Sequence, residues 1–300
     1  MEKNPENTLN TVQEVVLKVR DTYPFLDKKE MENFLYNATI IDSDENSDNV
    51  KKIDSILKLL NNPHAGIYEG KEMILPVEWR HGDLKTEKPF FEVLENIMYL
   101  KIPSLINIDY KDLETPFLEN AENTEGLIID LRYNGGGQEY PARTFITQYL
   151  SKPGDHLMGI NFTRDIGMSI NKDEIYVKGT NTPYEKSIAV LVNDETFSSA
   201  ERFVSVIKAS TDCVIIGTKT KGGSGNPKEY EFYEKDQKYY IWIPTWRFFL
   251  PGKDKPLEET KIEPDITYDK EDIIDFSIKY IKSKTEGVKK NNSQDLFVKI

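Results

Sequence analysis

The chain is poor in cysteine and histidine and has no long apolar run. Of its 300 residues, one is cysteine and three are histidine. A single cysteine cannot form an intrachain disulfide, and Cys213 lies in a strand-like apolar run, where a small buried thiol is the expected role. No apolar stretch approaches the roughly 20 residues that cross a bilayer, so no membrane span is expected.

Positive charge is also in deficit. Lysine and arginine number 39 against 51 aspartates and glutamates, which gives a formal net charge of −12. Because binding to a phosphate backbone needs a concentrated basic surface, this balance argues against nucleic acid as a partner. The N-terminus has no basic segment followed by an apolar one, so the chain as written is expected to be soluble and cytoplasmic. A leader removed earlier would leave no trace, and a secreted or cell-envelope location stays open.

The hydrophobic pattern divides the chain near residue 85. Residues 1–85 show apolar positions at helical spacing and predict a helical cap that carries His64. Residues 86–284 predict a core domain in which strands and helices alternate. The expected strands are 97–102, 127–131, 188–192 and 213–217, and the expected helices are 110–121, 141–150 and 199–209. This rhythm predicts an α/β fold with largely parallel strands.

Two segments depart from that rhythm. Residues 230–250 are dense in aromatics on either side of Asp236 and predict a long antiparallel hairpin. Its aromatics could line a groove, although ordinary sheet packing accounts for them as well. A final helix that includes Ile274 leads into a charged tail over residues 285–300, which is expected to be loosely ordered.

A possible nucleophile lies in residues 193–201, NDETFSSAE, which follow an apolar strand and open an amphipathic helix. The backbone holds a serine at such a corner from both sides, and the N–H groups of the first helical turn can face a developing negative charge. Ser198 is therefore a candidate nucleophile. The spacing from Ser198 to Glu201 is equally that of a capping box, which would make the serine a helix cap.

A glycine-rich loop follows another buried strand in residues 127–137, LIIDLRYNGGG. Consecutive glycines expose backbone amides and permit conformations closed to other residues, which suits an oxyanion hole or a phosphate cradle. The spacing matches neither of the standard nucleotide-binding loops, so an oxyanion role is favoured over nucleotide binding. A plain tight turn is the alternative. No cofactor and no metal are expected.

Two further segments carry groups suited to proton transfer. His64 lies in a loop just past a helix, and histidine is the natural general base near neutral pH, although a lone loop histidine is often a surface residue. His81 and His156 occur in polar contexts with no evident partner. Residues 256–266 contain several glutamates, each of which could simply be a solvated carboxylate.

The runs LIIDLRYNGGG and VLVNDETFSSAERF, in this order, resemble the C-terminal processing peptidases, also called tail-specific proteases. Residues 97–103, 215–223 and 262–266 resemble further segments of that family, and the likeness covers about residues 50 to 270. The resemblance implies a crotonase-like (ClpP/crotonase-type) core of repeated ββα units behind the helical cap. It also implies a serine-type endopeptidase or carboxyl-terminal processing peptidase with Ser198 as its nucleophile.

The chain departs from the best-known branch of that family, which uses a serine–lysine dyad. The position that matches the dyad lysine is Gly223. Lys219 or Lys221 could substitute for it. The interval between His64 and Ile97 is also too short for the substrate-recruiting PDZ module of the family, which is inferred to be absent.

Another branch, which the tricorn core protease represents, replaces the lysine with histidine and glutamate. By resemblance to it, His64 is the predicted base and Glu258 the residue that orients it, while the adjacent Glu259 stays open as an alternative. Such a triad works because histidine takes the serine proton and a carboxylate stabilises the imidazolium. Activity should then fall as His64 protonates near its ordinary pKa of about 6.5.

The sequence thus predicts a peptidase that acts on extended polypeptides through an acyl-enzyme. The remaining site residues are the Gly136 and Ser199 amides as oxyanion donors and Gly135, Gly137 and Phe197 beside the substrate. The alternative is a non-catalytic ligand- or peptide-binding protein on the same fold. The sequence does not give the oligomeric state.

Overall fold

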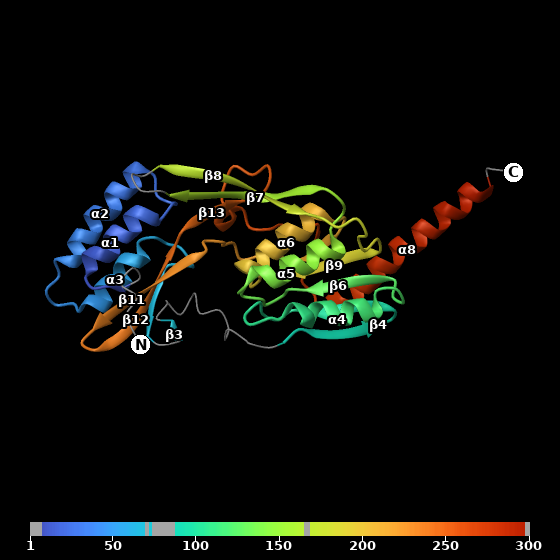
Figure 1. Ribbon diagram of the computed structural model, residues 1–300, viewed down its shortest axis with the longest axis horizontal. Helices are drawn as coiled ribbons and strands as arrows, with labels where there is room; N and C mark the ends of the chain where they lie inside the picture. Colours follow the sequence, from blue (N-terminus) through green and yellow to red (C-terminus); the bar gives the residue numbers. More distant parts are fainter. Residues whose placement is uncertain (1–7, 70–71, 74–87, 165–168, 298–300) are drawn as a thin grey trace. The chain divides into compact units, whose positions relative to one another are not determined.

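The computed structural model describes residues 8–69, 72–73, 88–164 and 169–297 of a mixed α/β protein (Figure 1). It divides into two compact units, each built from separate stretches of chain. The first unit comprises Met1–Asp83, Ile160–Glu174 and Gly223–Phe249. The second unit comprises Leu84–Gly159, Ile175–Gly222 and Leu250–Ile300. None of the described helices is both long and apolar enough to cross a membrane.

The first unit packs three helices against a five-stranded sheet. The helices are α1 (Val12–Thr22), α2 (Lys28–Asp42) and α3 (Asn49–Lys58). The side chains of Thr11, Asp27 and Asp48 begin these helices by accepting an amide of the first turn. The sheet order is β1 (Thr8–Leu9), β11 (Pro227–Glu234), β12 (Gln237–Pro244), β2 (Gly66–Glu69) and β3 (Glu72–Met73).

The predicted aromatic hairpin is present as β11 and β12, but it ends at Pro244, and Trp246–Phe249 of the predicted range forms a strand of another sheet. The strands pair antiparallel from Pro227 opposite Pro244 to Glu234 opposite Gln237. Lys235 and Asp236 close the turn with φ of 47° and 67°, the left-handed geometry of a two-residue hairpin loop. One face of the hairpin carries apolar side chains that join the helices in a single core: Tyr230, Phe232, Ile241 and Ile243.

The second unit is built on a six-stranded sheet in the order β14-β10-β9-β6-β5-β4. The strands are β4 (Phe90–Leu94), β5 (Ile97–Lys101), β6 (Gly126–Asp130), β9 (Ser187–Val192), β10 (Val214–Gly217) and β14 (Ile266–Thr267). All neighbours pair in parallel except β4 and β5. The expected parallel α/β arrangement is therefore confirmed for this sheet.

Helices cover the second sheet. They are α4 (Tyr110–Asn120), α5 (Glu139–Phe145), the π-helical turn η3 (Ile146–Leu150), α6 (Ser199–Ser210), α7 (Leu257–Thr260) and α8 (Ile273–Phe297). One face of the sheet packs against α8 through buried Ile278 and Ile281, while α5 packs against α4 and α6. The residues predicted as a loosely ordered tail continue α8 as far as Phe297.

A third sheet has the order β13-β7-β8, with β13 (Trp246–Phe249), β7 (Asp155–Arg164) and β8 (Ile170–Lys178). Its β13 pairs antiparallel with β7 from Trp246 opposite Thr163 to Phe249 opposite Ile160. The Arg164 guanidinium, at the end of β7, donates to the Tyr23 and Leu26 carbonyls that follow α1. These bonds tie β7 to the helices of the first unit.

The stability of the second unit should depend on the middle of its sheet. Ile129 of β6 is fully buried, so Ile129→Ala removes packed methyl groups and should lower the free energy of unfolding by about 2–5 kcal/mol. Val93 of β4 is 43% exposed, so Val93→Ala should change it by less than about 0.5 kcal/mol. Urea denaturation of both variants measures the difference. Equal effects would contradict this description of the core.

Candidate active site

The loops that carry the candidate residues leave neighbouring parallel strands at the same edge of the second sheet. The glycine loop follows β6, the Ser198 corner follows β9, and residues 218–222 follow β10. In open α/β sheets, ligands bind beyond the carboxyl ends of the strands, which is where these loops lie. The sheet therefore collects the predicted nucleophile and the predicted oxyanion loop at one edge.

Ser198 has a strained backbone immediately before α6. Its φ of 57° and ψ of −123° lie in a region that residues with a side chain rarely adopt. Holding a residue there costs on the order of 1–3 kcal/mol, and such positions cluster at functional sites. The loop before it is braced by Thr196, whose hydroxyl donates to the Leu131 carbonyl at 3.0 Å. The serine is therefore held at a fixed corner.

A buried carboxylate holds this corner from behind. Glu201 is fully buried and accepts hydrogen bonds from the Ser198 N–H at 3.1 Å and the Gly222 N–H at 3.0 Å. It also accepts from the Thr220 hydroxyl at 2.5 Å. Burial and, to a smaller extent, the charge of Glu258 raise the pKa of Glu201 to about 8, although the hydrogen bonds that it accepts lower it. The glutamate half of the predicted capping box thus also connects the corner to the segment after β10.

The glycine loop lies directly against Ser198. A Cβ on Gly136 would lie 2.8 Å from the Ser198 Cβ and 3.0 Å from the Ser199 nitrogen, and Gly136 has φ +98°. Asn134, which is fully buried, maintains this approach, because its carbonyl accepts the Phe197 N–H at 2.9 Å. Its side chain donates to the Ile102 carbonyl at 2.8 Å. Only glycine fits at position 136.

The two predicted oxyanion donors differ in their present hydrogen bonds. The Gly136 N–H donates to the Asn134 Oδ1 at 2.8 Å, so it can serve an oxyanion only by sharing or leaving that bond. The Ser199 N–H lies in the first turn of α6 and has no acceptor among the described residues. The Ser199 hydroxyl donates to the Gly137 carbonyl at 2.7 Å, which ties the loop to the helix.

The two candidate glutamates lie in different surroundings. Glu258 is half-buried on α7, its carbonyl would lie 3.0 Å from a Cβ on Gly222, and its charge acts on buried Glu201. Glu259 is exposed and forms a surface ion pair with Lys255 at 3.0 Å. Glu258 thus lies near the buried Glu201, whereas Glu259 faces solvent, and the choice between them stays a prediction.

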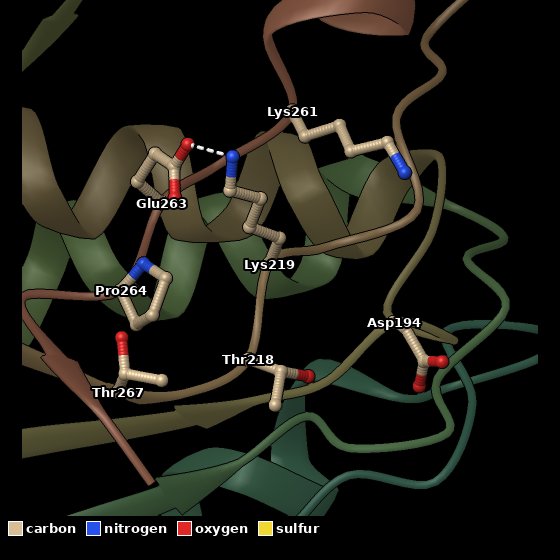
Figure 2. Close-up of a pocket in the computed structure, with 7 residues that line it drawn as sticks. All are labelled: Asp194, Thr218, Lys219, Lys261, Glu263, Pro264 and Thr267. Atoms are coloured by element: carbon tan, nitrogen blue, oxygen red, sulfur yellow. Dashed lines mark ion pairs between the residues drawn. The ribbon is translucent and has the colours of Figure 1, made fainter. Parts of the chain in front are cut away.

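The lysines proposed as substitutes for the dyad lysine also lie in this unit. Lys219 forms an exposed ion pair with Glu263 in a shallow surface pocket, in which Lys261 points away from that pair (Figure 2). The ammonium of Lys221 lies 5.9 Å from the ring centre of buried Phe197. Burial lowers the pKa of Lys221, and the charge of Lys261 lowers it further. The ion pair of Lys219 gives no support for a role as base.

His64 belongs to the first unit, whereas Ser198 and Glu258 belong to the second. His64 is buried, with 4% of its surface exposed, and is not the surface residue that a loop position suggested. Its backbone N–H donates to the Asn62 Oδ1 at 2.9 Å. Burial lowers the pKa of His64 to about 4, below the ordinary value that the sequence analysis assumed. Its role as the base remains a prediction. Of the other histidines, His156 bonds the Lys152 carbonyl at 2.8 Å, and His81 lies outside the described residues.

Sequence reasoning missed two residues that build this site. Asn134 precedes the glycines and joins three segments. The Thr220 hydroxyl donates to Glu201 and accepts the Ile262 N–H at 2.8 Å, so it connects these two residues. The only signal for Asn134 was its place between a strand and a glycine run, where asparagine commonly bonds the amide two residues on. Nothing local marked Thr220, because its partners are distant in the sequence.

The close approach of the glycine loop gives a stability test with a matched control. Gly136→Ala forces a side chain into a 2.8 Å contact at a left-handed φ, so it should lower the free energy of unfolding by at least about 1–3 kcal/mol. Gly135 has ordinary φ and nothing within 4 Å of a built Cβ, so Gly135→Ala should leave stability within about 0.5 kcal/mol. Urea unfolding compares the two. Tolerance of alanine at position 136 would refute the approach described here.

Burial of His64 gives a pH test of folding. Because the pKa falls from about 6.5 in the unfolded chain to about 4 in the folded one, the unfolded chain binds more protons between these values. The free energy of unfolding should therefore rise with pH through this window. In His64→Gln that rise should be shallower. His156→Gln, which replaces another histidine in the same way, is the control. Identical slopes for wild type and His64→Gln would show that His64 is not buried.

Comparison with known proteins places this geometry in a family. Residues 96–268 match the model of peptidase family S41. The carboxy-terminal processing protease CtpA of Bacillus subtilis (strain 168) is 30% identical over 178 residues, which are 59% of this chain and 34% of that protein. The chain therefore matches about a third of the length of that curated relative.

Solved structures share the fold. A predicted peptidase from Parabacteroides merdae ATCC 43184 has a TM-score of 0.64 at 18% identity, covering 91% of this chain and 93% of that one. The photosystem II D1 C-terminal processing protease has a TM-score of 0.59 at 14% identity, covering 86% and 92%. At these identities the likeness shows the fold alone. The family match, which covers more than half of the sequence, shows that the chain belongs to peptidase family S41.

Proposed function

We propose that this protein is a serine-type peptidase that hydrolyses peptide bonds of extended polypeptides through an acyl-enzyme. The observation that carries the proposal is the contact between the glycine loop and the strained Ser198 corner. A strained serine beside glycine amides and the start of a helix is the arrangement that acyl transfer needs. Membership of family S41 and the likeness to a carboxy-terminal processing protease support the same reaction class.

In the first step, the Ser198 Oγ attacks the carbonyl carbon of the scissile peptide bond. His64 accepts the serine proton, and the carbonyl oxygen becomes negatively charged. The carbon–nitrogen bond then breaks, and His64 returns the proton to the leaving amine. Water deprotonated by His64 attacks the resulting ester, which releases the new carboxyl terminus and restores Ser198.

The backbone amide of Ser199 is the proposed principal oxyanion donor, with Gly136 as the second. Each such donor contributes on the order of 3 kcal/mol to stabilising the transition state. The role of the Ser199 N–H as a donor is supported because it has no acceptor among the described residues. Gly136 would serve by sharing the N–H that now bonds Asn134. Gly135, Gly137 and Phe197 are the proposed residues beside the bound peptide.

His64 as base and Glu258 as its orienting carboxylate complete the proposed triad. A buried imidazole with a pKa of about 4 is neutral at physiological pH, as a general base must be, but it is a weaker base than an ordinary histidine. Glu258 would then stabilise the imidazolium formed during the reaction. This assignment implies that activity persists below pH 6.5. We further propose a crotonase-like core and the absence of a PDZ module between His64 and Ile97.

Labelling with a fluorophosphonate tests nucleophile, base and orienting residue together. The wild type should be modified at Ser198, and Ser198→Ala should not be labelled at all. His64→Ala and Glu258→Gln should each slow labelling at least about tenfold, because the serine loses its activated base. Glu259→Gln is the matched control for Glu258→Gln and should label within about twofold of wild type. Mass spectrometry of the adduct locates the label.

Two results would overturn the proposal. A folded wild type that takes up no fluorophosphonate would favour the alternative function, a non-catalytic binder on the same fold. Full labelling of His64→Ala would leave Ser198 as a nucleophile but remove His64 as its base. In that case Lys221→Met becomes the variant that tests the remaining base.

A further inference from the structure

Tyr133 is exposed where its backbone is strained. Its φ is 64°, a left-handed conformation that is unfavourable for a residue with a bulky side chain. Its side chain is 64% exposed. Among the described residues, the phenol makes no hydrogen bond and the ring contacts no other aromatic ring. Packing inside the protein therefore does not explain the choice of tyrosine.

The strain is imposed from both sides. The Tyr133 N–H donates at 2.9 Å to the Asn193 Oδ1, which also accepts the Glu195 N–H at 3.3 Å. Before Tyr133 in the sequence, the Arg132 guanidinium donates two hydrogen bonds, of 2.9 Å and 2.6 Å, to buried Asp130. After Tyr133, Asn134 is fully buried. The backbone of Tyr133 is therefore fixed, and the ring extends from a fixed point of the loop.

That position is beside the proposed nucleophile. Tyr133 is anchored to the loop between β9 and Ser198, and it precedes the glycine loop that contacts the Ser198 Cβ. The three residues after Asn134 are glycines, so Tyr133 is the nearest residue on this loop, toward β6, with a large exposed side chain. A peptide that extends from the glycines toward β6 would therefore pass this residue.

We infer that Tyr133 is a specificity-determining residue that binds an apolar side chain of the polypeptide substrate next to the scissile bond. The inference rests on the proposed peptidase function. An aromatic ring offers a large apolar surface at little cost in side-chain entropy, because it has only two rotatable bonds. Asp194 and Glu195 follow the anchoring Asn193, and their charges disfavour an acidic side chain there. The strained backbone fixes the point on the loop from which the ring extends.

The test separates the ring from the backbone. Tyr133→Phe keeps the apolar ring and should keep the cleavage preference. Tyr133→Gly and Tyr133→Asn remove the ring, and both residues adopt a left-handed φ readily. In these two variants, the ratio of kcat/KM for apolar over acidic residues beside the cut should fall at least ~10-fold, while the melting temperature stays equal or rises. Tyr36→Ala is the control, since Tyr36 is 69% exposed on α2.

Unfolded β-casein is the substrate, and mass spectrometry of the new termini gives the cleavage preference. The rate of fluorophosphonate labelling is measured on every variant and should stay within about twofold of wild type, because Ser198 is unchanged. An unaltered preference in Tyr133→Gly would overturn the inference, and so would a loss of preference that follows a loss of labelling. Absence of labelling in the wild type would instead overturn the peptidase function, so the two failures are distinguishable.

Discussion

The contact between the glycine loop and the Ser198 corner is the constraint on which the rest of the candidate site depends. Asn134 produces it by bonding the strand end at Ile102, the Gly136 amide and the Phe197 amide at once, from a fully buried position. Buried polar groups rigidify a structure when all their bonds are made. One asparagine therefore fixes the relative positions of the loops that follow three neighbouring strands.

Two of the described non-glycine residues with positive φ lie where that contact is made. Ser198 and Tyr133 both have positive φ, one on each of the two loops that meet. Glu201 is a buried carboxylate whose burial disfavours its charge, yet it holds the Ser198 amide. Each feature is unfavourable for folding alone, and such features persist where the surrounding structure enforces them for function. The parallel sheet beneath supplies that rigid support.

Much of both units followed from sequence pattern. The apolar strands, the amphipathic helix after Ser198 and the aromatic hairpin were predictable, because burial imposes their periods on the residues. The packing of the hairpin into the same core as α1 and α3 was not predictable, because it joins segments that lie nearly two hundred residues apart in the sequence. The bonds of Asn134 and Thr220 are equally non-local. The burial of His64 was missed because a polar loop normally lies on the surface.

The most direct test of the account is a crystal structure with a peptide boronic acid, which forms a tetrahedral adduct with an activated serine. The account predicts a bond from the Ser198 Oγ to boron and a boronate oxygen about 2.7–3.1 Å from the Ser199 nitrogen, beside the glycine loop. An adduct on another residue, or a Ser198 adduct whose oxygens all face away from that amide, would contradict it.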